Sequence, residues 1–73
     1  MRIRVDMESD ALYVRFSEDP IEESEEVADG VILDYDAQGR IVGLEIVGLK
    51  KRLKVEELHT VQVELPTGVK AAR

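Results

Sequence analysis

The stretch Val31-Ile-Leu-Asp-Tyr-Asp-Ala-Gln-Gly-Arg-Ile-Val-Gly-Leu-Glu-Ile-Val47 decides the fold class of this chain. It contains two apolar runs, residues 31–35 and 40–47, separated by a four-residue polar segment. β-Branched residues favour strands, and Gly39 can take the positive φ that a tight turn requires. The stretch therefore predicts a β-hairpin, and Gly43 predicts a bulge or a close approach by another backbone.

Alternation of polar and apolar residues predicts further strands on both sides of this hairpin. Residues 2–6 and 11–16 alternate with period two and should pair as an antiparallel hairpin. The acidic segment 21–29 is interpreted as an edge strand that ends at Val27, because dense charge protects an edge from unwanted pairing. Residues 60–65 alternate again and predict a last strand, which joins either the sheet of its own chain or that of a neighbouring subunit. Residues 69–73 should form a frayed tail.

The sequence predicts a single small domain over residues 1–73, mainly β and at the margin of α+β. Its antiparallel sheet should have about five strands arranged in hairpins. Leu49 and Leu53 lie four residues apart, which favours one short helix near residues 49–58. The apolar positions of the alternating strands give the predicted core, which consists of Ile3, Val5, Leu12, Val14, Phe16, Val31, Leu33, Leu44 and Ile46.

The length of the chain favours self-association. A domain of 73 residues buries only about 60% of the surface that its unfolded chain exposes, so such domains commonly need an additional source of stability. The chain has no cysteine and one histidine, which excludes disulfides and an imidazole metal site within one chain. One short helix cannot cover both faces of the central hairpin, so we expect a second copy to complete the burial in a C2 homodimer.

The net charge of the chain and the distribution of its apolar residues oppose several classes of function. The net charge is −6, and residues 1–49 carry 13 acids against 4 bases. An acidic body repels phosphate backbones, so nucleic-acid binding is not expected. Arg2, Arg4 and Asp6 interrupt any secretory apolar run, and no segment approaches the length of a membrane span, so we expect a cytoplasmic protein without a membrane partner. The charged fraction of 36% favours a thermophilic source.

The hairpin turn also imitates a calcium-binding loop. Hard cations prefer several oxygen ligands around a sharp turn that is closed by a glutamate. The positions of this pattern are filled by Asp34, Asp36, Gln38, Gly39, Ile41 and Glu45. The strand character of residues 41–47 opposes this interpretation, since an extended strand would carry Glu45 about 20 Å from the turn. We therefore favour a plain hairpin turn, with a metal site at Asp34, Asp36 and Gln38 as the alternative.

Two charge clusters and one histidine are the remaining candidates. The acidic cluster is either a docking face for a basic partner protein or a solvated edge, and its central members are Glu22, Glu23, Glu25 and Glu26. The basic residues Lys50, Lys51, Arg52 and Lys54 have no aromatic neighbour to support a nucleic-acid role. His59 lacks an evident nucleophile or orienting group, so we expect neither an enzyme nor a cofactor.

Four blocks of the sequence together resemble a known family. They are Arg2-Ile-Arg-Val-Asp6, Asp10-Ala-Leu-Tyr-Val-Arg-Phe16, Gly30-Val-Ile-Leu-Asp-Tyr-Asp36 and Gly39-Arg-Ile-Val-Gly-Leu-Glu-Ile46. Their order over about residues 2–53 resembles the bacterial and archaeal family called domain of unknown function 2283. The resemblance implies a small β-rich domain with no assigned activity, catalytic residue or cofactor. It also implies an antitoxin-like role, because some such domains are regarded as the antitoxin half of toxin–antitoxin pairs.

Overall fold

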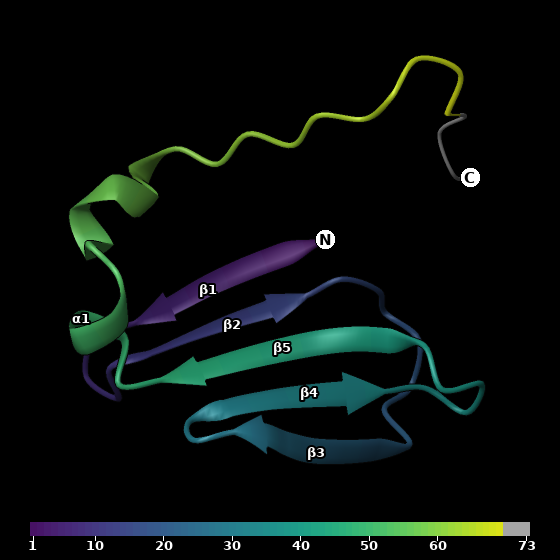
Figure 1. Ribbon diagram of the computed structural model, residues 1–73, viewed down its shortest axis with the longest axis horizontal. Coiled ribbons are helices and arrows are strands. Elements are labelled where there is room, and N and C mark those ends of the chain that lie inside the picture. The colour runs from purple at the N-terminus through teal and green to yellow at the C-terminus, as the bar shows by residue number, and fades with distance from the viewer. Residues whose placement is uncertain (70–73) are drawn as a thin grey trace.

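The computed structural model describes residues 1–69, which form a five-stranded antiparallel sheet followed by two short helices (Figure 1). The spatial order of the strands is β1-β2-β5-β4-β3, so β5 is central and β1 and β3 are the two edges. The elements are β1 (Arg2–Asp6), β2 (Ala11–Arg15), β3 (Glu23–Ala28), β4 (Val31–Tyr35), β5 (Ile41–Val47), the α-helix α1 (Leu49–Arg52) and the 3-10 helix η1 (Val55–His59). The predicted fold class is therefore confirmed.

The register of the strands divides the sheet into an apolar face and a polar face. Residues directly opposite one another on neighbouring strands point to the same face. The apolar face comprises Ile3, Val5, Leu12, Val14, Leu44, Ile46, Val31 and Leu33. The polar face includes Arg4, Tyr13, Glu45, Asp34 and Ser24.

Asp10 holds the first helix against one end of the sheet. Its carbonyl oxygen accepts hydrogen bonds from the backbone N–H groups of Gly48 and Leu49, both at 3.0 Å. Its carboxylate accepts a third bond from the backbone N–H of Lys50, also at 3.0 Å. These acceptors satisfy N–H groups that a helix leaves without partners at its start. The Leu49 side chain is consequently fixed against Leu12 and Val14, where it is fully buried.

The predicted core is only partly correct. Leu12 and Val14 are buried, and Val5, Leu44 and Ile46 pack against them, whereas Val31 and Leu33 are half-buried. Ile3 and Phe16 are 40% and 44% exposed, so their assignment to the core is wrong for the single chain. Ile3 and Phe16 are exposed because the two short helices cover only one end of the apolar face of the sheet (Figure 1). Two fully buried residues, Val42 and Leu49, were absent from the prediction.

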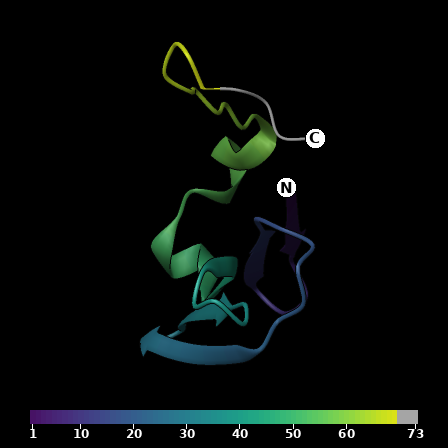
Figure 2. The ribbon, with the colours of Figure 1, turned by 90° about the vertical axis from the view of Figure 1, so that its right-hand side faces the viewer.

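The segment after β5 differs from its prediction in two ways. The helix expected near residues 49–58 is divided, because Leu53 is extended and separates α1 from η1. The strand predicted for residues 60–65 is wrong for the single chain, since the segment is not paired in the sheet. In both ribbon views it runs beyond the β1 side of the sheet (Figures 1 and 2). Alternation alone does not make a strand when no neighbouring strand accepts its hydrogen bonds.

The edge strand of the acidic segment is confirmed to within one residue of its predicted end. Strand β3 ends at Ala28, and its pairing with β4 shifts register at Val27. All six of its residues are exposed. The tail predicted for residues 69–73 lies outside the described residues apart from Val69. No helix within residues 1–69 is long and apolar enough to cross a membrane.

Candidate functional site

The turn between β4 and β5 is organised by the carboxylate of Asp36. One oxygen accepts bonds from the backbone N–H groups of Gln38 at 2.9 Å and Arg40 at 2.8 Å. The other oxygen accepts a bond from Nε of Arg40 at 2.9 Å. These donors lower the pKa of Asp36, with the backbone N–H of Arg40 as the largest cause, although burial of the carboxylate opposes them. Gly39 has φ 78°, the conformation expected for a plain turn.

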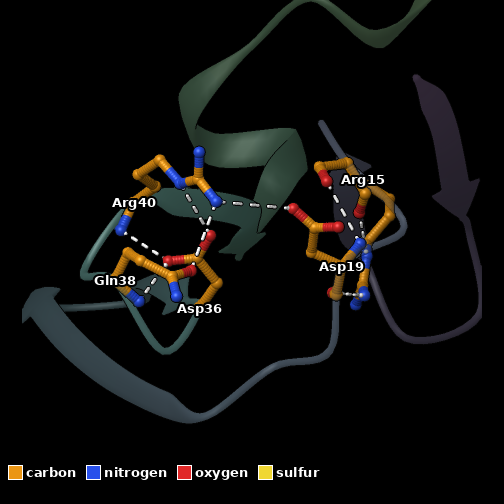
Figure 3. A network of polar contacts seen from close by, with 6 residues as sticks. Arg15, Asp19, Asp36, Gln38 and Arg40 are labelled. Carbon is orange, nitrogen blue, oxygen red and sulfur yellow. Dashed lines mark hydrogen bonds and ion pairs between the residues drawn. The ribbon is translucent and has the colours of Figure 1, made fainter. Parts of the chain in front are cut away.

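A chain of polar contacts joins this turn to the loop between β2 and β3 (Figure 3). The guanidinium of Arg40 lies 4.0 Å from a carboxylate oxygen of Asp19. Arg15 donates to the backbone oxygens of Ser17 at 2.6 Å and Asp19 at 2.5 Å. The Arg15 side chain therefore positions the loop by binding the backbone oxygens of the loop. The Arg40–Asp19 ion pair is exposed and adds little stability in water.

Asp34 lies on the polar face and is held by two hydroxyl groups. Tyr13 donates to one carboxylate oxygen at 3.0 Å, and Ser24 donates to the other at 2.6 Å. Gly43 provides the space for this arrangement, since a Cβ at that position would lie 2.6 Å from Asp34 Oδ2. The pairing of β4 with β5 also shifts register beside Gly43, so the predicted bulge is present. The groups that approach Gly43 are the side chains of Asp34 and Tyr13, whereas the alternative prediction was an approaching backbone.

The oxygens of the three residues of the calcium alternative accept hydrogen bonds from different parts of the chain. The Asp34 oxygens contact Tyr13 and Ser24, and those of Asp36 contact the turn. The side-chain oxygen of Gln38 accepts a bond from Arg40 at 3.2 Å. Among residues 1–69, no group of three or more histidine, cysteine, aspartate or glutamate side chains is placed to hold a metal ion.

The predicted docking residues lie along one edge of the sheet but divide between its faces. Glu23 is opposite Tyr35 and Glu25 is opposite Leu33, which places both glutamates beside the apolar face. Glu26 points to the polar face and accepts a bond from the backbone N–H of Gly30 at 3.0 Å. Glu22 precedes the strand. We call these four residues, Glu22, Glu23, Glu25 and Glu26, the acidic edge.

No ion pair among residues 1–69 neutralises the acidic edge. The ion pairs formed among residues 1–69 involve Arg2 with Glu18 and Arg40 with Asp19 and Asp36, so none includes these four carboxylates. Tyr35 donates a bond of 3.3 Å to Glu25. Burial of the tyrosine, together with the charges of Glu25 and Glu23, raises the pKa of Tyr35.

The basic residues Lys50, Lys51, Arg52 and Lys54 lie on and just after α1, and His59 ends η1. Arg52 donates to the backbone oxygen of Asp29, which ties α1 to the turn between β3 and β4. Lys50 and Lys51 are exposed on α1. His59 Nδ1 lies 2.7 Å from the backbone oxygen of Glu56, at the end of η1. The arrangement of His59 is that of a helix-end residue.

Comparison with known protein families identifies the family of this domain. The profile of the family described as protein of unknown function (DUF2283) matches residues 2–50, which include all five strands and the start of α1. The chain belongs to this family. The DUF2283 match confirms the resemblance found in the sequence, and it leaves η1 and residues 60–69 outside the matched region. No curated protein and no solved structure shows significant similarity to the chain.

Sequence reasoning identified the acidic edge but missed the contact between Tyr13 and Asp34. Their link depends on β2 and β4 both pairing with β5, which places Tyr13 and Asp34 on the same face. One sequence signal was available: a glycine inside an apolar strand marks a position where another group approaches closely. Gly43 carries that signal, and Asp34 and Tyr13 are the groups that approach it.

Proposed function

We propose that this DUF2283 domain is a non-enzymatic protein-interaction module whose acidic edge binds a basic partner protein. The observation that carries the proposal is an exposed, unneutralised row of carboxylates along β3, bordered by apolar surface. An isolated charge run is commonly only a solvated edge. The neighbouring apolar surface is what distinguishes this one.

The apolar surface beside the acidic edge is substantial for so small a domain. Ile21, which precedes β3, and Ile41 are both more than two-fifths exposed. Ile41 is the cross-strand partner of Tyr35, and Tyr35 is the partner of Glu23, so apolar and acidic side chains follow one another across the sheet. Interfaces combine an apolar centre with a polar rim, and this surface has both.

The charge pattern specifies the chemistry of the partner. Glu23 and Glu25 point to the same face as Leu33 and Tyr35, so a complementary surface would carry lysine or arginine beside apolar side chains. Dense charge on an edge strand opposes backbone pairing, so the contact would be made by side chains. A small basic protein of the kind that an antitoxin neutralises fits this description.

The test is affinity capture of partners by the full chain, at low and high salt, with a charge-reversed variant and a matched control. The E23K/E25K variant reverses two charges on the acidic edge. The E56K/E57K variant makes the same change of net charge on η1, where the reversed side chains are exposed.

The proposal predicts one basic protein captured in stoichiometric amount by the unmodified chain and by E56K/E57K, and lost with E23K/E25K. Capture should weaken as salt rises, because exposed charges are screened over roughly 8 Å at physiological ionic strength. Capture that is equal for both variants, or insensitive to salt, would remove the acidic edge from the interaction.

A calcium-binding function has no supporting observation in the geometry, because Tyr13 and Ser24 donate to the oxygens of Asp34, and Arg40 donates to those of Asp36 and Gln38. The interaction module is therefore the one function that we propose for the domain.

A further inference from the structure

We propose that residues 60–65 form an exchanged arm, which adds as a sixth strand to the β1 edge of a second copy of this chain. This inference does not rest on the proposed function, because it concerns the opposite edge of the sheet. The surface is the open edge β1, and its occupant is the segment Thr60-Val-Gln-Val-Glu-Leu65 of a partner copy.

The arm is an amphipathic strand that lacks a sheet within its own chain. Val61, Val63 and Leu65 are 54%, 61% and 67% exposed. Outside helices and strands, the only backbone hydrogen bond among residues 60–69 is the turn contact from Val69 to Pro66. Thr60 is extended, with φ −136° and ψ 131°. An extended, alternating and apolar segment without a partner is suited to strand addition.

The chain exposes more surface than a compact monomer of its mass. Its accessible surface is 6024 Å², whereas the size scaling for monomeric proteins gives about 4,500 Å² at 8.2 kDa. Its radius of gyration is 13.8 Å, against about 11 Å for a compact chain of this length. The excess of about 1,500 Å² exceeds the roughly 800 Å² that each partner buries in a standard interface.

The β1 edge presents the side chains that the arm would complement. Alternation places Val61, Val63 and Leu65 on one face of an added strand and Gln62 and Glu64 on the other. On β1, Ile3 and Val5 point to the apolar face, whereas Arg2 and Arg4 point to the polar face. The apolar face would therefore gain a further row beside the exposed Ile3. Glu64 would lie directly opposite or diagonal to Arg4.

The charges needed for this pairing are available. Arg4 and Glu64 take part in no ion pair among residues 1–69. Arg2 pairs only with Glu18, and both of those side chains are largely exposed. Exchange of two arms about a two-fold axis would place one Glu64 beside an Arg4 in each half of the dimer. The two edges of the sheet would then differ: the arm of the partner copy would cover β1, and β3 would stay accessible to other proteins.

The start of the arm is fixed by packing. Val55 and Leu58 of η1 pack against the core cluster of Leu12, Val14 and Leu49. The arm leaves from this anchored helix and lies beyond the β1 side of the sheet in both ribbon views (Figures 1 and 2). The arm is thus directed away from the interior of its own sheet, where the β1 edge of a second copy could pair with it.

The first experiment compares the solution mass of the full chain with that of two proline variants. Val63→Pro removes a backbone N–H from the centre of the arm and blocks strand pairing. Thr67→Pro is the matched control, because Thr67 occupies the position of a turn at which proline is compatible, before Gly68 with φ 96°. We expect a dimer for the unmodified chain and for Thr67→Pro, and a monomer for Val63→Pro.

The second experiment uses charge exchange to identify the pairing as intermolecular. Arg4→Glu and Glu64→Arg should each raise the dimer dissociation constant about tenfold, because each symmetric dimer then contains two like-charge pairs. An equimolar mixture should recover near-native affinity, since both pairs of the mixed dimer are again opposite in charge. Pairing of the arm within its own chain cannot be rescued by mixing.

Three results would overturn the proposal. A monomeric mass for the unmodified chain at micromolar concentration would exclude the exchange, even if residues 60–65 were protected from hydrogen exchange by pairing with their own β1. A dimer that survives Val63→Pro would indicate association through the open apolar face instead. If an equimolar mixture of the two charge variants failed to recover dimer affinity, Glu64 of one copy would not lie beside Arg4 of the other.

Discussion

Asp34 and Gly43 oppose each other on β4 and β5, and the carboxylate of Asp34 occupies the space where a Gly43 side chain would lie. A Cβ at Gly43 would come within 2.6 Å of Asp34 Oδ2 and 2.9 Å of the Tyr13 hydroxyl oxygen. The absence of a side chain at one residue thus permits a hydrogen-bonded carboxylate at the other.

Gly43→Ala should lower the free energy of unfolding by about 1–3 kcal/mol, because the added methyl group displaces Asp34 from its two hydroxyl donors. Urea denaturation of the full chain measures the change. Gly39→Asn is a suitable control, since a turn position with positive φ and open surroundings tolerates asparagine. If both variants lost equal stability, glycine flexibility would explain the effect better than the contact with Asp34.

Alanine substitutions at Leu49 and Leu53 test whether the core includes only the first of these two leucines. Leu49→Ala should cost about 2–5 kcal/mol, because it removes a fully buried side chain from the contact with Leu12 and Val14. Leu53, four residues later, is exposed, and its substitution by alanine should cost less than about 1 kcal/mol. Thermal unfolding followed by circular dichroism measures both.

A domain of this length has a total stability of roughly 4–11 kcal/mol by the usual value per residue, so the Leu49→Ala chain should be near the limit of folding. Similar melting temperatures for the two leucine variants would mean that α1 contributes little to the core.

Calcium should leave the hairpin turn unchanged. Amide chemical shifts of residues 34–45 should not move at millimolar calcium, because Asp34 and Asp36 direct their oxygens to Tyr13, Ser24 and the turn itself. Magnesium at the same ionic strength controls for screening. A saturable shift that occurs with calcium alone would restore the metal site that the sequence pattern imitates.

The sequence predicted the hairpins because their signals are local. Alternation over residues 2–6 and 11–16, and a glycine turn between residues 31–35 and 40–47, depend on neighbours in the chain. The burial of Leu49 depends on Asp10, which lies 39 positions earlier and accepts the N–H groups of the helix start. No periodicity within residues 49–58 contains that information.

The alternation of residues 60–65 predicts a sheet strand for the same local reason. Whether such a segment pairs depends on where the preceding helix directs it, and η1 directs it beyond the β1 side of the sheet. The acidic edge was predictable from charge, but its division between faces required the register of β3 against β4.

Asp36 should make the stability of the domain fall at low pH. Its pKa is below the ordinary value of 3.8 because the N–H groups of Arg40 and Gln38 bind the charged carboxylate. The unfolded chain therefore binds the proton at a higher pH than the folded chain, and the stabilisation is present above 3.8. It is lost as the pH falls through the lower pKa of the folded state.

The Asp36→Asn variant isolates this charge, because the amide oxygen can still accept the two backbone bonds of the turn. It should be less stable than the unmodified chain at pH 7, and the difference should shrink towards zero as the pH falls below 3.8. Asp6, whose pKa the N–H and hydroxyl of Ser9 also lower, provides a positive control through Asp6→Asn. A difference that stays constant between neutral and acid pH would assign the role of Asp36 to turn geometry, with no contribution from its charge.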